Sequence, residues 1–147
     1  MRHVTDAGIA LIKRFEGFSP TIYICPAGYP TVGYGHLVRP EERSRFAGGI
    51  TPDEGEDLLR QDVRSAEAAV LRWIRVPLSD GQFDALVSFT FNLGSGALQR
   101  STLRRNVNRE QSFDAPREFG KWVFAGGKKS AGLVKRRAAE SIRYRSS

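Results

Sequence analysis

The sequence has few cysteines, few histidines and no long apolar run. Its single cysteine, Cys25, rules out a disulfide within the chain and fits folding in a reducing cytosol. With two histidines, His3 and His36, and no cysteine–histidine cluster, it predicts no metal site and no cofactor. The apolar runs fall well short of the roughly 20 residues that cross a bilayer, and Lys13 and Arg14 interrupt the N-terminal region. We therefore expect no secretory signal, no stable membrane insertion, and a cytoplasmic protein that another agent must release.

Acidic residues are also outnumbered, because 23 lysines and arginines face 16 aspartates and glutamates and give a formal net charge of +7. Such a chain is attracted to polyanions. An anionic cell wall, a membrane surface and nucleic acid are candidate partners, and a merely soluble basic domain is the plain alternative. At 147 residues the chain can bury one complete core, so we expect a single domain over residues 1–147 and a monomer.

The first half of the chain predicts a helix followed by a small sheet. Apolar residues at helical spacing indicate a helix over 6–16, with Thr5 as its N-cap and Gly17 as its end. Strand-forming residues over 21–24 and 31–34 are separated by a proline–glycine turn, which predicts a β-hairpin. The polar, glycine-containing stretch 39–49 indicates a loop or an irregular third strand.

The second half predicts helices. A capping box at Thr51 opens a long helix to about residue 74, and a second box at Ser79 opens another helix that Gly94 stops. Shorter helices are expected near 102–108 and 113–125, and Gly126-Gly127 is expected to close the second of them. A basic C-terminal helix follows, with an apolar side formed by Leu133, Val134, Ile142 and Tyr144.

These elements predict an α+β fold with two lobes. The sheet lobe covers about 17–50, and the helical lobe covers about 75–147 together with the N-terminal helix. The long helix after Thr51 joins the two lobes.

Glu16 is the first candidate for chemistry because it lies in the last turn of the first predicted helix. The negative end of the helix dipole, and desolvation by Phe15 and Phe18, favour the protonated carboxyl that a general acid requires. The alternative is an exposed helix-end glutamate, which local sequence alone favours. If the hairpin folds back, Thr31 presents a hydroxyl near Glu16. Taken singly, Thr31 is an ordinary strand residue and Cys25 a small buried one.

Three blocks of sequence carry a more specific pattern. The first is Glu16-Gly17, Tyr23, Cys25, Gly28 and Thr31-Val32-Gly33-Tyr34-Gly35-His36. The second is Gln82, Asp84-Ala85-Leu86, Ser88-Phe89, Phe91-Asn92, Gly94 and Ser101-Thr102-Leu103. The third is Trp122, Ala125-Gly126-Gly127, Gly132-Leu133, Arg136-Arg137 and Glu140. In this order, over most of the chain, the blocks resemble the phage T4-type lysozymes, the glycoside hydrolase family of endolysins.

The resemblance implies a lysozyme-like fold with a cleft between the lobes, and hydrolysis of the glycosidic bond between N-acetylmuramic acid and N-acetylglucosamine in bacterial peptidoglycan. Glu16 matches the catalytic acid, and Thr31 matches the threonine that helps to position the attacking water. Substrate contacts fall at Leu37, Phe91 and Thr102. The resemblance also implies a structural histidine at His36, and Arg136 or Arg137 facing the cleft to pair with Glu16 or a neighbour. It further implies storage in the host cytoplasm until a membrane-perforating protein gives access to the wall, and then host cell lysis.

Cys25 departs from the family pattern, which has an aspartate there. Glycosidases usually use two carboxylates, whereas a thiol is mostly neutral at pH 7. Three interpretations stay open. The thiol is partly ionised and acts as base or nucleophile; or it is tolerated, with Glu16 and a water bound to Thr31 doing most of the work; or the activity is weakened or lost, including by deliberate substitution.

The sequence thus favours a lysozyme over two other functions. A peptidoglycan-binding module with a lysozyme fold is supported by Cys25 and opposed by the retention of Glu16 and Thr31. A membrane-active or nucleic-acid-binding protein is supported by the net charge and the arginine-rich tail. A solvated helix face explains that tail equally well, so we expect peptidoglycan rather than nucleic acid as the partner.

Overall fold

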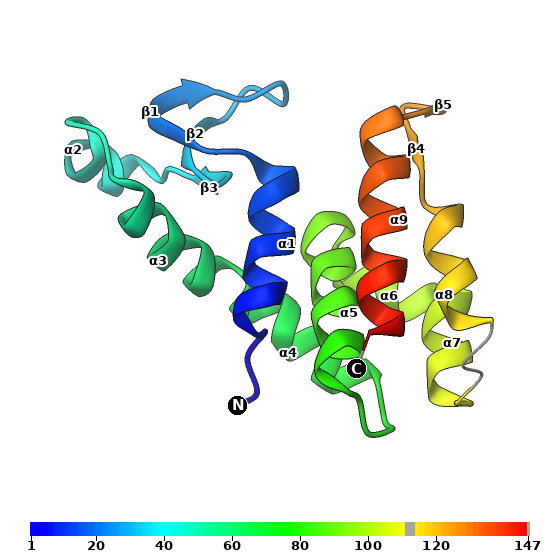
Figure 1. The fold of residues 1–147 in the computed structure, drawn as a ribbon. Coiled ribbons are helices and arrows are strands. Elements are labelled where there is room, and N and C mark those ends of the chain that lie inside the picture. Colours follow the sequence, from blue (N-terminus) through cyan, green and yellow to red (C-terminus); the bar gives the residue numbers. More distant parts are fainter. Residues whose placement is uncertain (111–113, 147) are drawn as a thin grey trace. The chain divides into compact units, whose positions relative to one another are not determined.

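The computed structural model describes residues 1–110 and 114–146 (Figure 1). The chain forms two compact units. The helical unit combines Met1–Ile12 with Ser65–Ser147, and the sheet unit is Lys13–Arg64. A mostly helical chain with a small antiparallel sheet near its N-terminus confirms the expected α+β class.

Helix α1 (Asp6–Glu16) has the predicted bounds. Its N-terminus is capped by Thr5, whose hydroxyl accepts a hydrogen bond from the backbone N–H of Gly8 at 3.2 Å. Its buried face includes Ile12, which has no exposed surface. The helix ends where Gly17 takes a φ of +69°, a backbone conformation that glycine adopts without a steric penalty. Local signals therefore fix the position of Glu16 at the end of α1.

The predicted hairpin is present and a third strand extends it. The sheet contains β1 (Ser19–Ile24), β2 (Pro30–Gly33) and β3 (His36–Leu37), antiparallel in the order β1-β2-β3. One face of this sheet covers a small apolar core in which Phe18 and Ile22 pack against five buried side chains, namely Val32, Val38, Phe46, Ile50 and Leu58.

The stretch 39–49 was expected to be a loop or an irregular strand, and that expectation is wrong for its first part. Pro40–Glu42 forms a short 3-10 helix (η1) and Arg43–Phe46 a short α-helix (α2). The proline is favourable at a helical start, and Phe46 is buried at 3 % exposure. Phe46 is a single apolar residue in a polar stretch, which gives no periodic hydrophobic pattern, so the sequence did not predict these two short helices.

The helix predicted over 51–74 is present as α3 (Pro52–Asp62) and α4 (Arg64–Trp73), interrupted at Val63. The capping box predicted at its start is formed: the Thr51 hydroxyl accepts from the Glu54 N–H at 3.2 Å, and the Glu54 carboxylate accepts from the Thr51 N–H at 3.0 Å. Val63 has a ψ of −11°, far from the helical value of about −42°.

The helical unit continues with α5 (Asp80–Leu93) and α7 (Thr102–Asn108), both as predicted. Between them lies α6 (Ser95–Arg100), which the sequence did not predict. The capping box at Ser79 is formed with Gln82. Helix α5 is buried along most of its length and lies beside the C-terminal helix α9 (Ala131–Arg145) (Figure 1).

The helix expected near 113–125 is shorter than predicted. Its first residue, 113, lies outside the described residues. The described part is α8 (Ala115–Glu118) and a 3-10 turn, η2 (Phe119–Lys121), followed by a hairpin of β4 (Phe124–Ala125) and β5 (Lys128–Lys129). Gly126 and Gly127 both have positive φ, 57° and 80°, as a two-residue hairpin turn requires. The glycine pair that was expected to close a helix therefore turns a hairpin.

The apolar side predicted for α9 is largely wrong. Val134 and Ile142 are 37 % and 66 % exposed, whereas Arg136, Arg137 and Glu140 are at most 4 % exposed. The helix packs against α5 through Arg136, Arg137 and Glu140, so these three charged residues do not belong to a solvated face, whereas Lys135 and Arg145 are exposed. Hydropathy could not reveal this, because a buried arginine depends on a partner that is distant in sequence.

Candidate active site

The carboxylate of Glu16 lies close to the turn between β2 and β3 in the sheet unit. A Cβ atom added to Gly35 would lie 3.1 Å from Glu16 Oε1, and the φ of Gly35 is +81°. The positive φ favours a glycine there, and any larger residue would also make the Glu16 carboxylate shift slightly. Glu16 also lines an open pocket of about 360 Å³ together with Gly17, Phe18, Ser19 and Tyr23. The end of α1 therefore presents a carboxylate at a concave surface.

Three side chains form a row across the face of the sheet opposite its small core. Tyr23 pairs with Thr31, and Thr31 pairs with Leu37. Residues directly opposite each other in antiparallel strands share a face. Tyr23 is also a wall of the pocket that Glu16 lines. Thr31 is 2 % exposed and Leu37 is 56 % exposed, so the row runs from a wall of the pocket, through a buried hydroxyl, to an exposed apolar side chain.

Cys25 and Thr31 lie together at the turn that follows β1. The Thr31 hydroxyl donates to the Tyr29 carbonyl at 3.0 Å and is also within hydrogen-bonding reach of the cysteine sulfur. The pKa of the Cys25 thiol is lowered most by the backbone N–H of Tyr29, and then by the Thr31 hydroxyl and the backbone N–H groups of Ala27 and Gly28. Burial of the thiol opposes this lowering. Cys25 is partly exposed, so it is not the buried apolar residue that its type suggests. These donors favour the thiolate at this position.

Comparisons with known proteins identify the family of this chain. The chain matches the phage lysozyme family over residues 13–140. The chain belongs to that family. It is 38 % identical over 148 residues to an endolysin of Acyrthosiphon pisum secondary endosymbiont phage 1, covering 98 % of this chain and 99 % of that one. It is 41 % identical over 140 residues to an endolysin of Bacillus phage B103, covering 94 % of this chain. The chain spans 52 % of that longer relative.

Solved structures confirm the lysozyme-like fold of this phage lysozyme. A mutant of P22 lysozyme superposes with a TM-score of 0.89 at 33 % identity, covering 98 % of this chain and 99 % of that one. The muramidase domain of SpmX from Asticaccaulis excentricus superposes with a TM-score of 0.87 at 33 % identity, covering 99 % and 100 %. Within the described residues, no helix is both long enough and apolar enough to cross a membrane.

The imidazole ring of His36, on β3 of this lysozyme, lies between two carboxylates. Its Nδ1 lies 2.8 Å from Asp62 Oδ2 and its Nε2 lies 3.3 Å from Glu42 Oε1. Its ring meets the Phe46 ring edge-on, with centroids 5.7 Å apart. The hydrogen bond and charge of Asp62, followed by those of Glu42, raise the pKa of His36 against the opposing effect of burial. The histidine thus ties β3 to α3 and η1, as a structural residue would.

The raised pKa of His36 predicts a stability that depends on pH. The protonated ring is stabilised in the folded state, so its contribution is fully present below about pH 6.5, the ordinary pKa of histidine. That contribution is lost as the pH rises through the higher folded pKa. We expect His36→Gln to lower the free energy of unfolding more at pH 5.5 than at pH 8.5, measured by urea denaturation. Equal losses at the two pH values would contradict the ionic role.

The family resemblance implied that Arg136 or Arg137 faces the cleft and pairs with Glu16 or a neighbour, and that pairing stays a prediction. Both arginines contact Glu140 in the helical unit. Arg136 Nε donates to Glu140 Oε2 at 3.3 Å, and Arg137 Nη2 donates to the same oxygen at 3.2 Å. Ser88 Oγ donates to it as well, at 2.6 Å. Sequence spacing offered the signal, because Glu140 lies four and three residues after the arginines on one helix.

Six residues were predicted for the site, and the sheet unit contains four of them, namely Glu16, Cys25, Thr31 and Leu37. Phe91 and Thr102 belong to the helical unit, on α5 and at the first position of α7. Both are partly buried, and the Thr102 hydroxyl accepts from Arg105 Nη2 at 2.8 Å. Sequence reasoning did not select Tyr23 and Gly35 as site residues, although both lie in the motif that revealed the family.

Proposed function

We propose that this phage lysozyme is a muramidase that hydrolyses the bond between N-acetylmuramic acid and N-acetylglucosamine, with Glu16 as its general acid. The observation that carries the proposal is the position of Glu16, which ends α1 at the rim of a pocket shared with Tyr23. A general acid must reach a substrate oxygen from a fixed position, and the end of α1 provides such a position for the carboxylate. The structural similarity to the SpmX domain, which is a muramidase domain, supports the same bond specificity.

In the proposed reaction, Glu16 donates its proton to the oxygen that links the two sugars, so that the leaving sugar departs as a neutral alcohol. Positive charge develops on the ring that remains, and a water molecule completes the hydrolysis. Thr31 is suited to position this water because its buried hydroxyl, which donates to the Tyr29 carbonyl, keeps oxygen lone pairs that can accept from the water. The exposed side chain of Leu37 provides an apolar surface for a sugar ring on the same face of the sheet.

Cys25 is proposed to act beside Thr31 as the basic partner of Glu16. The donors around its sulfur lower the pKa of the thiol and increase the fraction present as thiolate. A thiolate carries the negative charge that a carboxylate would supply next to a cationic transition state. The sequence left open whether this thiol participates or is merely tolerated, and the lowered pKa favours participation.

Cys25→Asp tests this role. If position 25 needs only a basic group, we expect the variant to keep or exceed the wild-type rate of cell-wall lysis, whereas Cys25→Ala loses roughly tenfold or more. The measurement is the rate of turbidity loss with purified wall. A large loss in Cys25→Asp would mean that the surroundings of position 25 are specific for sulfur. Full activity in Cys25→Ala would remove the residue from the mechanism.

We further propose that Phe91 and Thr102 contact the glycan from the helical unit, and that the enzyme acts as a monomer on peptidoglycan without binding nucleic acid. The proposed route is storage in the host cytoplasm followed by release to the wall. The direct test is digestion of purified sacculi by the wild-type protein. Soluble fragments support the proposal, whereas binding to sacculi without any release of fragments contradicts it.

A further inference from the structure

The loop between β1 and β2 joins the two residues that are proposed to act beside the general acid. It consists of residues 26–28, flanked by Cys25 and Tyr29. The Cys25 N–H donates to the Tyr29 carbonyl at 2.9 Å, and the Gly28 N–H donates to the Cys25 carbonyl at 2.8 Å. These two hydrogen bonds close a hairpin loop of three residues. We refer to residues 25–29 as the 25–29 turn.

Gly28 gives the 25–29 turn its shape. Its φ is +90°, a backbone conformation that residues with a Cβ atom rarely adopt. A positive φ at the last loop position turns the chain back, so that Tyr29 lies opposite Cys25. A Cβ atom added to Gly28 would meet no other atom within 4 Å. The constraint at this position is therefore the backbone conformation and not the available space.

The backbone of Tyr29 contacts both of the residues that the loop joins. Its carbonyl accepts from the Thr31 hydroxyl at 3.0 Å and also from the Cys25 N–H, so one oxygen atom holds both residues. A hydroxyl has a single proton, and donation to a fixed carbonyl therefore fixes the direction of its oxygen lone pairs. On its other side, the Tyr29 N–H is the group that lowers the pKa of the Cys25 thiol most.

We propose that Gly28 is a positioning residue for the hydrolysis of the glycan. Its positive φ holds the backbone of Tyr29 in place. The Tyr29 carbonyl then orients the Thr31 hydroxyl for the attacking water, and the Tyr29 N–H lies within hydrogen-bonding reach of the Cys25 sulfur. This role rests on the proposed function, because it concerns the residues assigned there to the water and to the basic partner of the acid. Gly28 acts through Tyr29 and not by contact with the substrate.

Gly28→Ala tests this role. The added methyl group has room, but a φ of +90° is unfavourable for alanine, so the loop should relax and move the Tyr29 backbone. We expect kcat to fall roughly tenfold to a hundredfold, because small displacements of positioned groups cost rates of this order, with little change in KM. The measurement is hydrolysis of a soluble peptidoglycan oligosaccharide. Gly28→Asn should retain more activity, since asparagine tolerates positive φ better than alanine.

A second measurement reports on the turn without any catalysis. Cys25 is the single cysteine of the chain and is partly exposed, so iodoacetamide alkylates this position alone. The thiolate is the reactive form, and the alkylation rate as a function of pH therefore gives the pKa of the thiol. Displacement of the Tyr29 N–H removes a donor to the sulfur and raises this pKa. We expect the inflection of the profile to move to higher pH in Gly28→Ala, which a general loss of stability would not cause.

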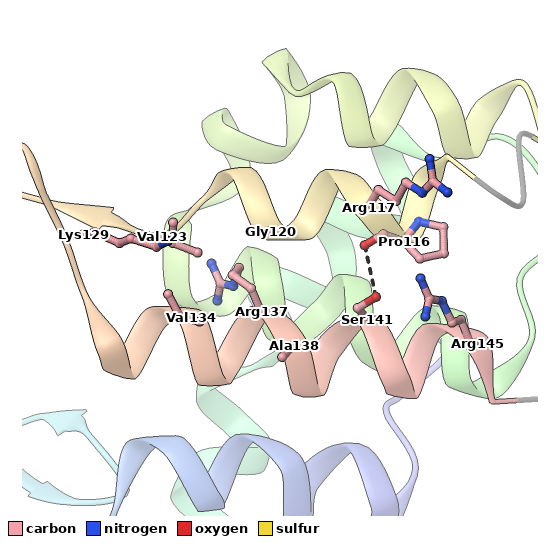
Figure 2. Close-up of a pocket in the computed structure, with 10 residues that line it drawn as sticks. All are labelled: Pro116, Arg117, Gly120, Val123, Lys129, Val134, Arg137, Ala138, Ser141 and Arg145. Carbon is pink, nitrogen blue, oxygen red and sulfur yellow. Dashed lines mark hydrogen bonds between the residues drawn. The ribbon is translucent and has the colours of Figure 1, made fainter.

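Two glycines outside the sheet unit provide matched controls. Gly127 turns the β4–β5 hairpin with a φ of +80°, and an added Cβ atom would meet nothing within 4 Å. Gly127→Ala therefore introduces similar backbone strain elsewhere. Gly120 lies on η2 beside a pocket that α9 also lines (Figure 2), and it has neither a positive φ nor a close neighbour. Gly120→Ala adds a methyl group without strain. Both controls should keep the wild-type kcat and the wild-type alkylation profile.

The outcomes separate this role from the proposed function. A wild-type kcat or an unshifted alkylation profile in Gly28→Ala would overturn the positioning role, as would equal changes in Gly127→Ala or a Gly28→Asn variant no more active than Gly28→Ala. If Gly28→Ala does not fold, Gly28→Asn replaces it, with smaller changes in the same directions. Absence of hydrolysis by the wild type would overturn the proposed function, whereas the alkylation profiles still decide whether Gly28 holds the turn against the thiol.

Discussion

Replacing Glu16 with glutamine will slow cell-wall lysis by at least about a hundredfold, while the protein keeps its fold. The glutamine side chain is nearly the same size and lines the same pocket, but it has no proton to give to the leaving oxygen. General acid catalysis contributes about 10² to 10⁴ in rate, so the loss should be far larger than any effect of altered packing. The measurement is the rate of turbidity loss of Gram-negative cells with permeabilised outer membranes.

The matched control is Glu41→Gln, the same substitution at an exposed glutamate of the sheet unit. It should lyse cells at the wild-type rate. Thermal unfolding should be closely similar in both variants, which separates loss of catalysis from loss of structure. Lysis by Glu16→Gln at a rate within a few-fold of wild type would show that another group is the acid.

Replacing Glu140 with glutamine will lower the free energy of unfolding by about 3–5 kcal/mol, because it leaves two buried arginine charges without their shared counter-charge. Glu140 is fully buried, and Arg136 and Arg137 are 4 % and 1 % exposed. Burial raises the pKa of Glu140 and lowers that of Arg137, while their mutual attraction opposes both shifts. The expected fall in melting temperature is on the order of 10 °C for a chain of this length.

Two controls sharpen this second prediction. Glu110→Gln removes an exposed carboxylate from the helical unit and should leave the melting temperature nearly unchanged. Replacing the whole trio with apolar residues of similar volume should recover much of the loss, because the desolvation of all three charges is then avoided. A melting temperature for Glu140→Gln equal to that of the wild type would mean that the arginines find other partners at no cost.

The features that sequence predicted well are those with local causes. The start of α1 follows from the Thr5 hydroxyl and its end from Gly17, and the capping boxes at Thr51 and Ser79 form as expected. The hairpin that joins Cys25 to Thr31 was similarly predictable, because strand-forming residues flank a turn. In each case the deciding contact lies within a few residues along the chain.

The features that sequence predicted poorly depend on distant contacts. The burial of Arg137 depends on Asn92, 45 residues away, and hydropathy placed this side chain in solvent. The turn at Gly126 and Gly127 forms a hairpin because β4 pairs with β5. Strands of two residues are too short to give a recognisable sequence pattern, so this pairing could not be predicted. The position of Glu16 beside the turn at Gly35 belongs to the same class, since only the folded sheet unit brings the two together.

The measurement that tests the central claim most directly is mass analysis of the fragments released from purified peptidoglycan by the wild-type protein and by Glu16→Gln. We predict that the wild type alone releases muropeptides with a new reducing end at N-acetylmuramic acid. Fragments ending in N-acetylglucosamine, fragments cut only in their peptides, or the same muropeptides from Glu16→Gln would contradict the assignment of this chain as a muramidase with Glu16 as its acid.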